Sequence, residues 1–178
     1  MNVSKETRNL VLSALFLTLA VIIQILGKSI PEISQFVVGP TVNAVLILTA
    51  YFAGLKWALL VGILTPVLAF VSGVLAAPMA PFIPFIAAGN LIYIVFFSLL
   101  KDWKNGEVLG IVLGALFKFA FLYFSASKLI NLISLGIPEP VKAKLVISMG
   151  IPQFITALVG GAAAILLYTL LNRRLKLK

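Results

Sequence analysis

One lysine lies in the middle of a long apolar run. Lys118 falls inside residues 111–126, and no other charged residue lies as deep in such a run; the five carboxylates are all outside. If this run crosses a membrane, the charge is costly there, so the side chain usually faces the protein interior and marks a functional site. The alternative is a lysine whose long side chain reaches back to the lipid headgroups. We expect Lys118 to belong to a binding site.

Polar and aromatic residues in other apolar runs could complete that site. Pockets for small molecules combine mostly apolar walls with a few placed polar groups. Each amide could instead simply hold two helices together, because a polar group in lipid needs a hydrogen-bond partner. The candidate substrate-binding residues are Asn43, Phe82, Phe85, Asn90, Lys118, Tyr123 and Gln153.

The composition indicates that membrane-spanning helices position these residues. The chain is 62% hydrophobic with a mean hydropathy of +1.17, well above a soluble domain. Its 178 residues have room for about six spans of roughly 20 residues each. The apolar runs predict spans at about 10–26, 40–52, 57–76, 82–100, 108–127 and 145–171. We therefore expect an all-α integral membrane bundle of six transmembrane helices, forming one domain over residues 1–178.

The basic residues in the connections predict how this bundle is oriented. With a cytoplasmic amino terminus, nine Lys and Arg residues lie on the inner side and four on the outer side. Short cytoplasmic connections carry an excess of Lys and Arg, so both termini are expected in the cytoplasm. The net charge of +9 then reflects orientation and attraction to the lipid bilayer. The basic residues form no single patch with exposed aromatics, so no nucleic-acid partner is expected.

Two outer connections could cover a pocket. Residues 76–85 contain three prolines among apolar residues, and proline withholds a backbone donor, so no regular helix is expected until after Pro84. A stiff apolar turn at the membrane surface would look the same in sequence. The functional interpretation is a lid over an outward-facing pocket, with residues 130–144 as a second candidate lid.

The missing residue types narrow the chemistry. The chain has no histidine and no cysteine, so we expect no metal and no cofactor. An ion-coupled transporter remains an alternative, although it would place carboxylates within its spans. An intramembrane hydrolase is another alternative and would need a serine paired with Lys118. The carboxylates, all in tails or loops, are Glu6, Glu32, Asp102, Glu107 and Glu139.

Small residues indicate where helices approach closely. Ala14 and Thr18 are four residues apart on one face of the first span, which would let a partner helix come near. The segments 110–114 and 160–164 predict close packing inside the bundle.

The chain resembles the substrate-binding S components of energy-coupling factor (ECF) transporters, which import vitamins and micronutrients into prokaryotic cells. The resemblance covers nearly the whole chain. It rests on the length, the predicted spans and the segments ALFLTLA (14–20), GPTVN (39–43), GILTP (62–66) and PQFIT (152–156). It implies a multi-pass protein of the cytoplasmic membrane with an outward site. That site would comprise Asn90, Lys118, Tyr123 and Gln153, with Phe82 and Phe85 nearby.

The resemblance also implies binding without self-powered transport. The chain has no glycine-rich phosphate loop of the Walker type, so ATP would be hydrolysed by partner subunits and this chain would not be an enzyme. The resemblance implies two such ATPase subunits. In the family, the small-residue face of the first span contacts a transmembrane coupling subunit, a role that falls here on Ala14 and Thr18. One lysine without a membrane-embedded carboxylate fits a neutral or anionic vitamin-like substrate better than a strongly cationic one.

Overall fold

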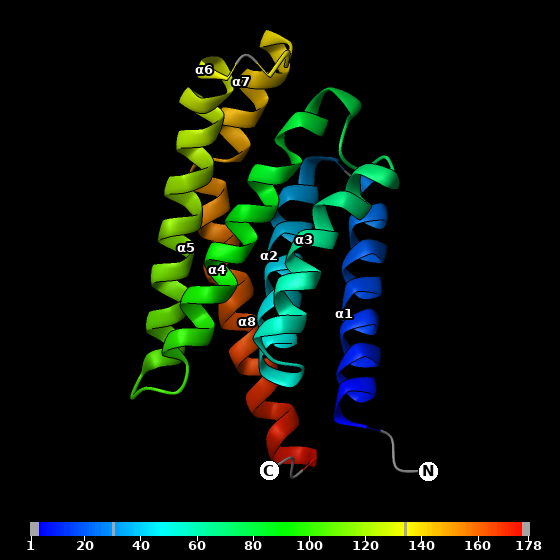
Figure 1. Cartoon of the computed structure of the whole chain (residues 1–178), viewed down its shortest axis with the longest axis vertical. Helices are drawn as coiled ribbons and strands as arrows, with labels where there is room; N and C mark the ends of the chain where they lie inside the picture. Colours follow the sequence, from blue (N-terminus) through cyan, green and yellow to red (C-terminus); the bar gives the residue numbers. More distant parts are fainter. Residues whose placement is uncertain (1–3, 30, 134, 176–178) are drawn as a thin grey trace.

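The computed structural model describes residues 4–29, 31–133 and 135–175, apart from the side chains of 31–35 and 175, and it is a bundle of helices (Figure 1). No β-strand occurs within these ranges. The long helices are α1 (Lys5–Lys28), α2 (Pro31–Phe52), α3 (Leu55–Val71), α4 (Ile83–Leu100), α5 (Gly106–Phe124) and α8 (Ile151–Leu175). The short ones are η1 (Ala77–Phe82), the π-helical turn η2 (Ser125–Leu129), α6 (Ile130–Leu132) and α7 (Glu139–Ser148).

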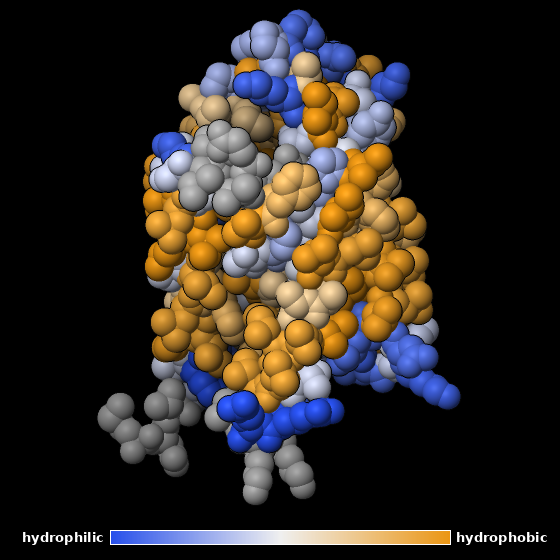
Figure 2. Space-filling view, turned by 180° about the vertical axis from the view of Figure 1, so that it is seen from behind, coloured by the Kyte–Doolittle hydropathy of each residue, from blue (hydrophilic) through white to orange (hydrophobic). Residues whose placement is uncertain are grey.

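The helices are apolar on their outer surfaces. Four described stretches are long and apolar enough to cross a membrane, namely Lys5–Lys28, Ala77–Leu100, Gly106–Leu132 and Ile151–Arg174. Phe36–Phe52 and Leu55–Val71 are shorter apolar helices. On the face that Figure 2 shows, apolar side chains cover most of the middle of the molecule, and hydrophilic groups gather at both ends. The prediction of an all-helical membrane protein is confirmed, but the described helices are not six full-length spans.

Several predicted boundaries need correction. The last predicted span, 145–171, is two helices, because α7 ends at Ser148 and α8 begins at Ile151. Pro152 lies in the first turn of α8, where its missing N–H is tolerated. Helix α2 begins at Pro31, well before the predicted residue 40, and continues through Pro40. Helix α3 ends at Val71 rather than 76, since Gly73 turns the chain with a φ of +69°.

The first and last helices share one end of the bundle. Helix α1 begins there and α8 ends there, beside the α2–α3 and α4–α5 turns (Figure 1). We call this the terminal end. The opposite end, which carries η1, α6 and α7, is the distal end. Which side of the membrane each end faces stays a prediction.

Helix α2 lies at the centre of the core. Its residues 43–50 are all buried, as expected for a helix that is apolar on every side. Glycines let its neighbours come close. A Cβ at Gly160 of α8 would collide with the backbone oxygen of Pro40 and lie 2.7 Å from the Cβ of Asn43. A Cβ at Gly110 of α5 would lie 2.9 Å from the Cα of Phe97. Both segments predicted to pack closely do so.

Replacing Gly160 with leucine should lower stability, because the backbone of α2 occupies the space that the side chain needs. Overpacking of this kind typically costs about 1–3 kcal/mol. The midpoint of thermal unfolding in detergent measures the effect. The matched control is Ala162→Leu, two residues further along α8 on its exposed side. Equal midpoints for the two variants would contradict the close contact between α2 and α8.

Candidate substrate-binding site

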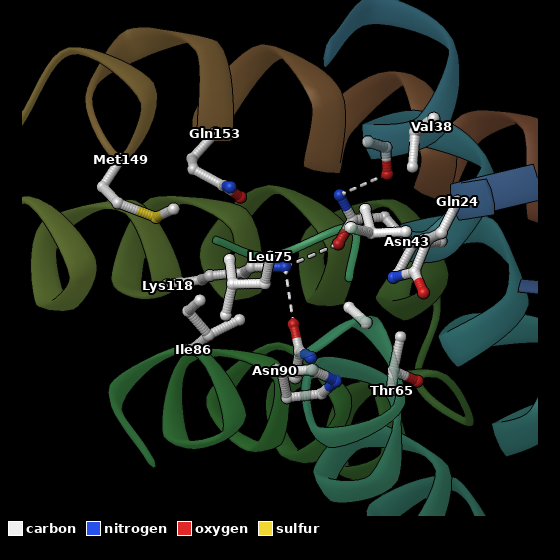
Figure 3. A pocket seen from close by; sticks show the side chains of 15 residues that line it. Gln24, Val38, Asn43, Thr65, Leu75, Ile86, Asn90, Lys118, Met149 and Gln153 are labelled. Atoms are coloured by element: carbon white, nitrogen blue, oxygen red, sulfur yellow. Dashed lines mark hydrogen bonds between the residues drawn. The ribbon is translucent and has the colours of Figure 1, made fainter. Parts of the chain in front are cut away.

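A cavity of about 200 Å³ lies among the helices (Figure 3). Its lining residues Gln24 and Val38 belong to the distal halves of α1 and α2. Helices α1 to α5 and the start of α8 contribute to its wall, together with the connection between α3 and η1 and the connection between α7 and α8. Most of the wall is apolar, which is typical of small-molecule sites. The lining residues are Gln24, Val38, Gly39, Val42, Asn43, Thr65, Pro66, Ala69, Val74, Leu75, Ile86, Asn90, Lys118, Met149 and Gln153.

Lys118 is the polar centre of this cavity. Only 3% of its surface is exposed. Its Nζ donates one hydrogen bond to Asn43 Oδ1 (2.6 Å) and another to Asn90 Oδ1 (3.0 Å). The same nitrogen lies 5.5 Å from the centre of the Tyr93 ring. Lys118 therefore joins α5 to α2 and α4. Its side chain faces the protein interior and does not reach back to the lipid headgroups.

The two amides are themselves oriented by helix carbonyls. Pro66 has no N–H, so the carbonyl of Gly62, one turn earlier in α3, lacks its usual helical donor. Asn90 Nδ2 donates to that oxygen at 3.0 Å. Asn43 Nδ2 donates to the carbonyl of Gly39 at 3.0 Å. Since a carbonyl only accepts and lysine only donates, each amide must turn its oxygen toward Lys118.

The structure brings four of the predicted site residues together. Asn43, Asn90, Lys118 and Gln153 line the cavity, and Gln153 turns its amide toward it (Figure 3). That these residues bind a substrate stays a prediction. The sequence left open whether the amides hold helices together or line a pocket. Asn43 and Asn90 do both, because they take part in hydrogen bonds between helices and line the cavity.

The three aromatic candidates do not line the cavity. Tyr123 follows Lys118 by five residues, which places it about 140° around an α-helix, and its side chain is 46% exposed. Phe82 and Phe85 stack on each other with ring centres 5.2 Å apart. They belong to a second apolar cluster with Leu122 and Leu145, between η1, α5 and α7. Placing these aromatics in the wall of the pocket was wrong for this cavity.

Several lining residues escaped the sequence analysis. Gln24 carried a usable signal, since it is a lone amide in the apolar run 20–26. Leu75 carried none. It reaches the wall because the chain reverses after Gly73, where the N–H groups of Val74 and Leu75 both donate to the carbonyl of Ala69 at 2.9 Å. The proline-rich segment that follows, which was predicted to be a lid, forms η1. The part of the cavity wall in this region comes from Val74 and Leu75, just before that segment.

The chemistry that this wall offers is recognition of a small solute. None of the described residues that line the cavity is an aspartate or a glutamate. The hydrogen bonds described for Lys118 go to amide oxygens, and neither acceptor is the serine hydroxyl that a hydrolase of the serine–lysine type would need. A mostly apolar cavity with one cation and several amides suits a compact ligand with a few polar groups.

The lysine and its amides should be energetically coupled. In a double-mutant cycle of Lys118→Met and Asn90→Leu, we expect a coupling of about 1.5–3 kcal/mol, the range for a hydrogen bond to a charged group. Thermal or denaturant unfolding in detergent measures it. The control cycle pairs Lys118→Met with Asn9→Ala, since the buried Asn9 donates to Ala53 at the terminal end and its effect should be additive. Additivity in both cycles would contradict the proposed network.

Comparison with known proteins identifies the family. The sequence profile of the family described as "ECF transporter, substrate-specific component" matches residues 8–172. No curated protein and no solved structure showed significant similarity to the chain. The match includes all of α2 to α5, most of α1 and α8, and all the residues that line the cavity. The resemblance seen in the sequence is confirmed, and the chain belongs to the substrate-specific components of ECF transporters.

Proposed function

We propose that this protein captures a vitamin-like small molecule in the cavity around Lys118. Separate coupling and ATPase subunits would then energise its import. The observation that carries the proposal is a mostly apolar cavity built around a buried, doubly hydrogen-bonded lysine in a chain of this family. Because five long helices and α8 all contribute to the wall, a ligand bound here would be held by the whole bundle.

The proposal places the protein in the cytoplasmic membrane of a prokaryotic cell, with the distal end outside. The distribution of basic residues supports this orientation. The terminal end carries Lys56 in α3 and Lys101 after α4, together with Arg173 and Arg174 in the last turn of α8. With the terminal end inside, the cavity opens nearer the outer surface, where substrate arrives.

The surface for the coupling subunit is the exposed face of α1. Ala14 and Thr18 are both exposed there. Thr18 Oγ1 donates to the carbonyl of Ala14 at 2.8 Å, so its hydroxyl already has a partner within its own helix. The opposite face of α1 is buried at Ser13 and Ala20. Small side chains with no unmet polar group allow another transmembrane helix to approach closely.

Tryptophan at position 14 should block assembly without harming the bundle. When the chain is co-expressed with the coupling and ATPase subunits of the same organism, we expect wild type to copurify with them and Ala14→Trp to lose most of the complex. Unfolding midpoints of the isolated variants should stay close to wild type, because Ala14 faces outward. Ala162→Trp is the matched control, an equally large change at an exposed alanine of α8.

One outcome would contradict the proposed interface, and another would contradict the proposed function. An intact complex with Ala14→Trp would contradict the placement of the interface on α1. A wild-type chain that fails to copurify with the coupling subunit, although well folded, would contradict the proposed function itself.

A further inference from the structure

We infer that the ligand is a compact monocarboxylate whose acidic group pairs with Lys118 and whose body presents a hydrogen-bond donor to Gln24. This inference rests on the proposed function, because it takes the cavity as the substrate site. Three features of the cavity lead to it: its uncompensated charge, its unpartnered acceptor and its mostly apolar wall.

The charge at Lys118 is stabilised but not neutralised. Its surroundings are two amide oxygens and the face of the Tyr93 ring, all of which favour a cation. The described ion pairs, Lys56 with Glu6 and Lys142 with Glu139, involve other lysines. Among the described residues of the wall there is no acidic side chain. A buried charge without a counterion is costly, and a bound anion would supply one.

The geometry at Nζ favours a singly charged group. An ammonium has three protons, and the two amide oxygens accept two of them. One donor is left for an oxygen of the ligand. A phosphate monoester carries close to two negative charges at neutral pH, so it would bring a second charge that this wall does not match. A carboxylate brings one charge and fits one lysine.

Gln24 supplies the second point of recognition. Its side chain is 7% exposed, and its Oε1 is buried without a hydrogen-bond partner in the described structure. Gln24 reaches the cavity from α1. In Figure 3 it lies on one side of Asn43, and Gln153 and Met149 lie on the other. A buried acceptor without a donor is costly. An N–H or O–H group of the ligand would meet this oxygen.

Much of the remaining wall is apolar. Val42 of α2, Leu75 of the α3–η1 connection and Ile86 of α4 all line the cavity. The body of the ligand should therefore be largely apolar. A cavity of about 200 Å³ limits it to a compact molecule.

The experiment compares matched acids and uncharged counterparts on the detergent-purified full chain. The probes are nicotinate with nicotinamide, biotin with biotin amide, and pantothenate with pantothenol, within a wider panel of monocarboxylate metabolites. Thermal shift finds binders and calorimetry gives their Kd. We expect an acid to bind at least about tenfold more tightly than its uncharged counterpart. Lys118→Met should raise the Kd of that acid by roughly tenfold to a hundredfold, the range for losing a charge-assisted hydrogen bond.

Two pairs of variants test the charge and the second contact. Gln153→Glu adds a carboxylate to the wall and should raise the Kd of the acid. Gln153→Leu, its uncharged control, should raise that Kd much less. Gln24→Leu should raise the Kd of acids that carry a distal N–H or O–H, such as biotin or pantothenate. It should leave unchanged any acid that lacks one, such as nicotinate.

Several results would overturn the inference. They are tighter binding of a neutral or cationic probe, equal binding of the acid by Lys118→Met, or no stabilisation by any monocarboxylate of the panel. An unchanged Kd in Gln24→Leu for donor-bearing acids would overturn the second contact. Each of these leaves the proposed function standing if wild type still copurifies with the coupling subunit. Loss of that copurification would instead remove the function on which the inference rests.

Discussion

A positive charge buried among helices needs acceptors that are themselves held in place, and much of this molecule follows from that need. Lys118 finds its acceptors on two other helices, at Asn43 and Asn90. Each amide is anchored in turn by a backbone carbonyl, at Gly39 and at Gly62. The carbonyl of Gly62 is available because a proline follows it by four residues. A helix irregularity in α3 therefore sets the geometry of a lysine on α5.

The choice of amides rather than carboxylates decides what the site can do. An aspartate at either position would pair with Lys118 and cancel its charge inside the protein. An amide oxygen stabilises the ammonium and leaves its net charge available. Close packing makes the arrangement rigid. Because residue 160 of α8 is a glycine, the backbones of α8 and α2 touch beside Asn43. Rigid, neutral acceptors around a cation are what the proposed binding of an anion would require.

Helix α1 connects the two surfaces that the proposed function needs. Its exposed face carries Ala14 and Thr18, and its buried face carries Gln24 into the cavity wall. Thr18 and Gln24 are six residues apart, which is about 9 Å along the helix axis. The surface that we propose for the coupling subunit and a part of the cavity wall thus belong to one helix.

The sequence alone determined the membrane class, the family, the close packing at glycines and the interior position of Lys118, because hydropathy and a lone charge are properties of the residues themselves. It could not decide which neighbours that charge meets. Tyr123 seemed close in sequence, yet helical periodicity turns it away, while Gln24 comes to the cavity from a distant helix. The split of the last predicted span, like the place of Leu75 in the wall, depends on a local turn. Only tertiary packing decides which residues of different helices face one another. This depends on the rotation and tilt of each helix and on where the chain reverses, and hydropathy does not encode these.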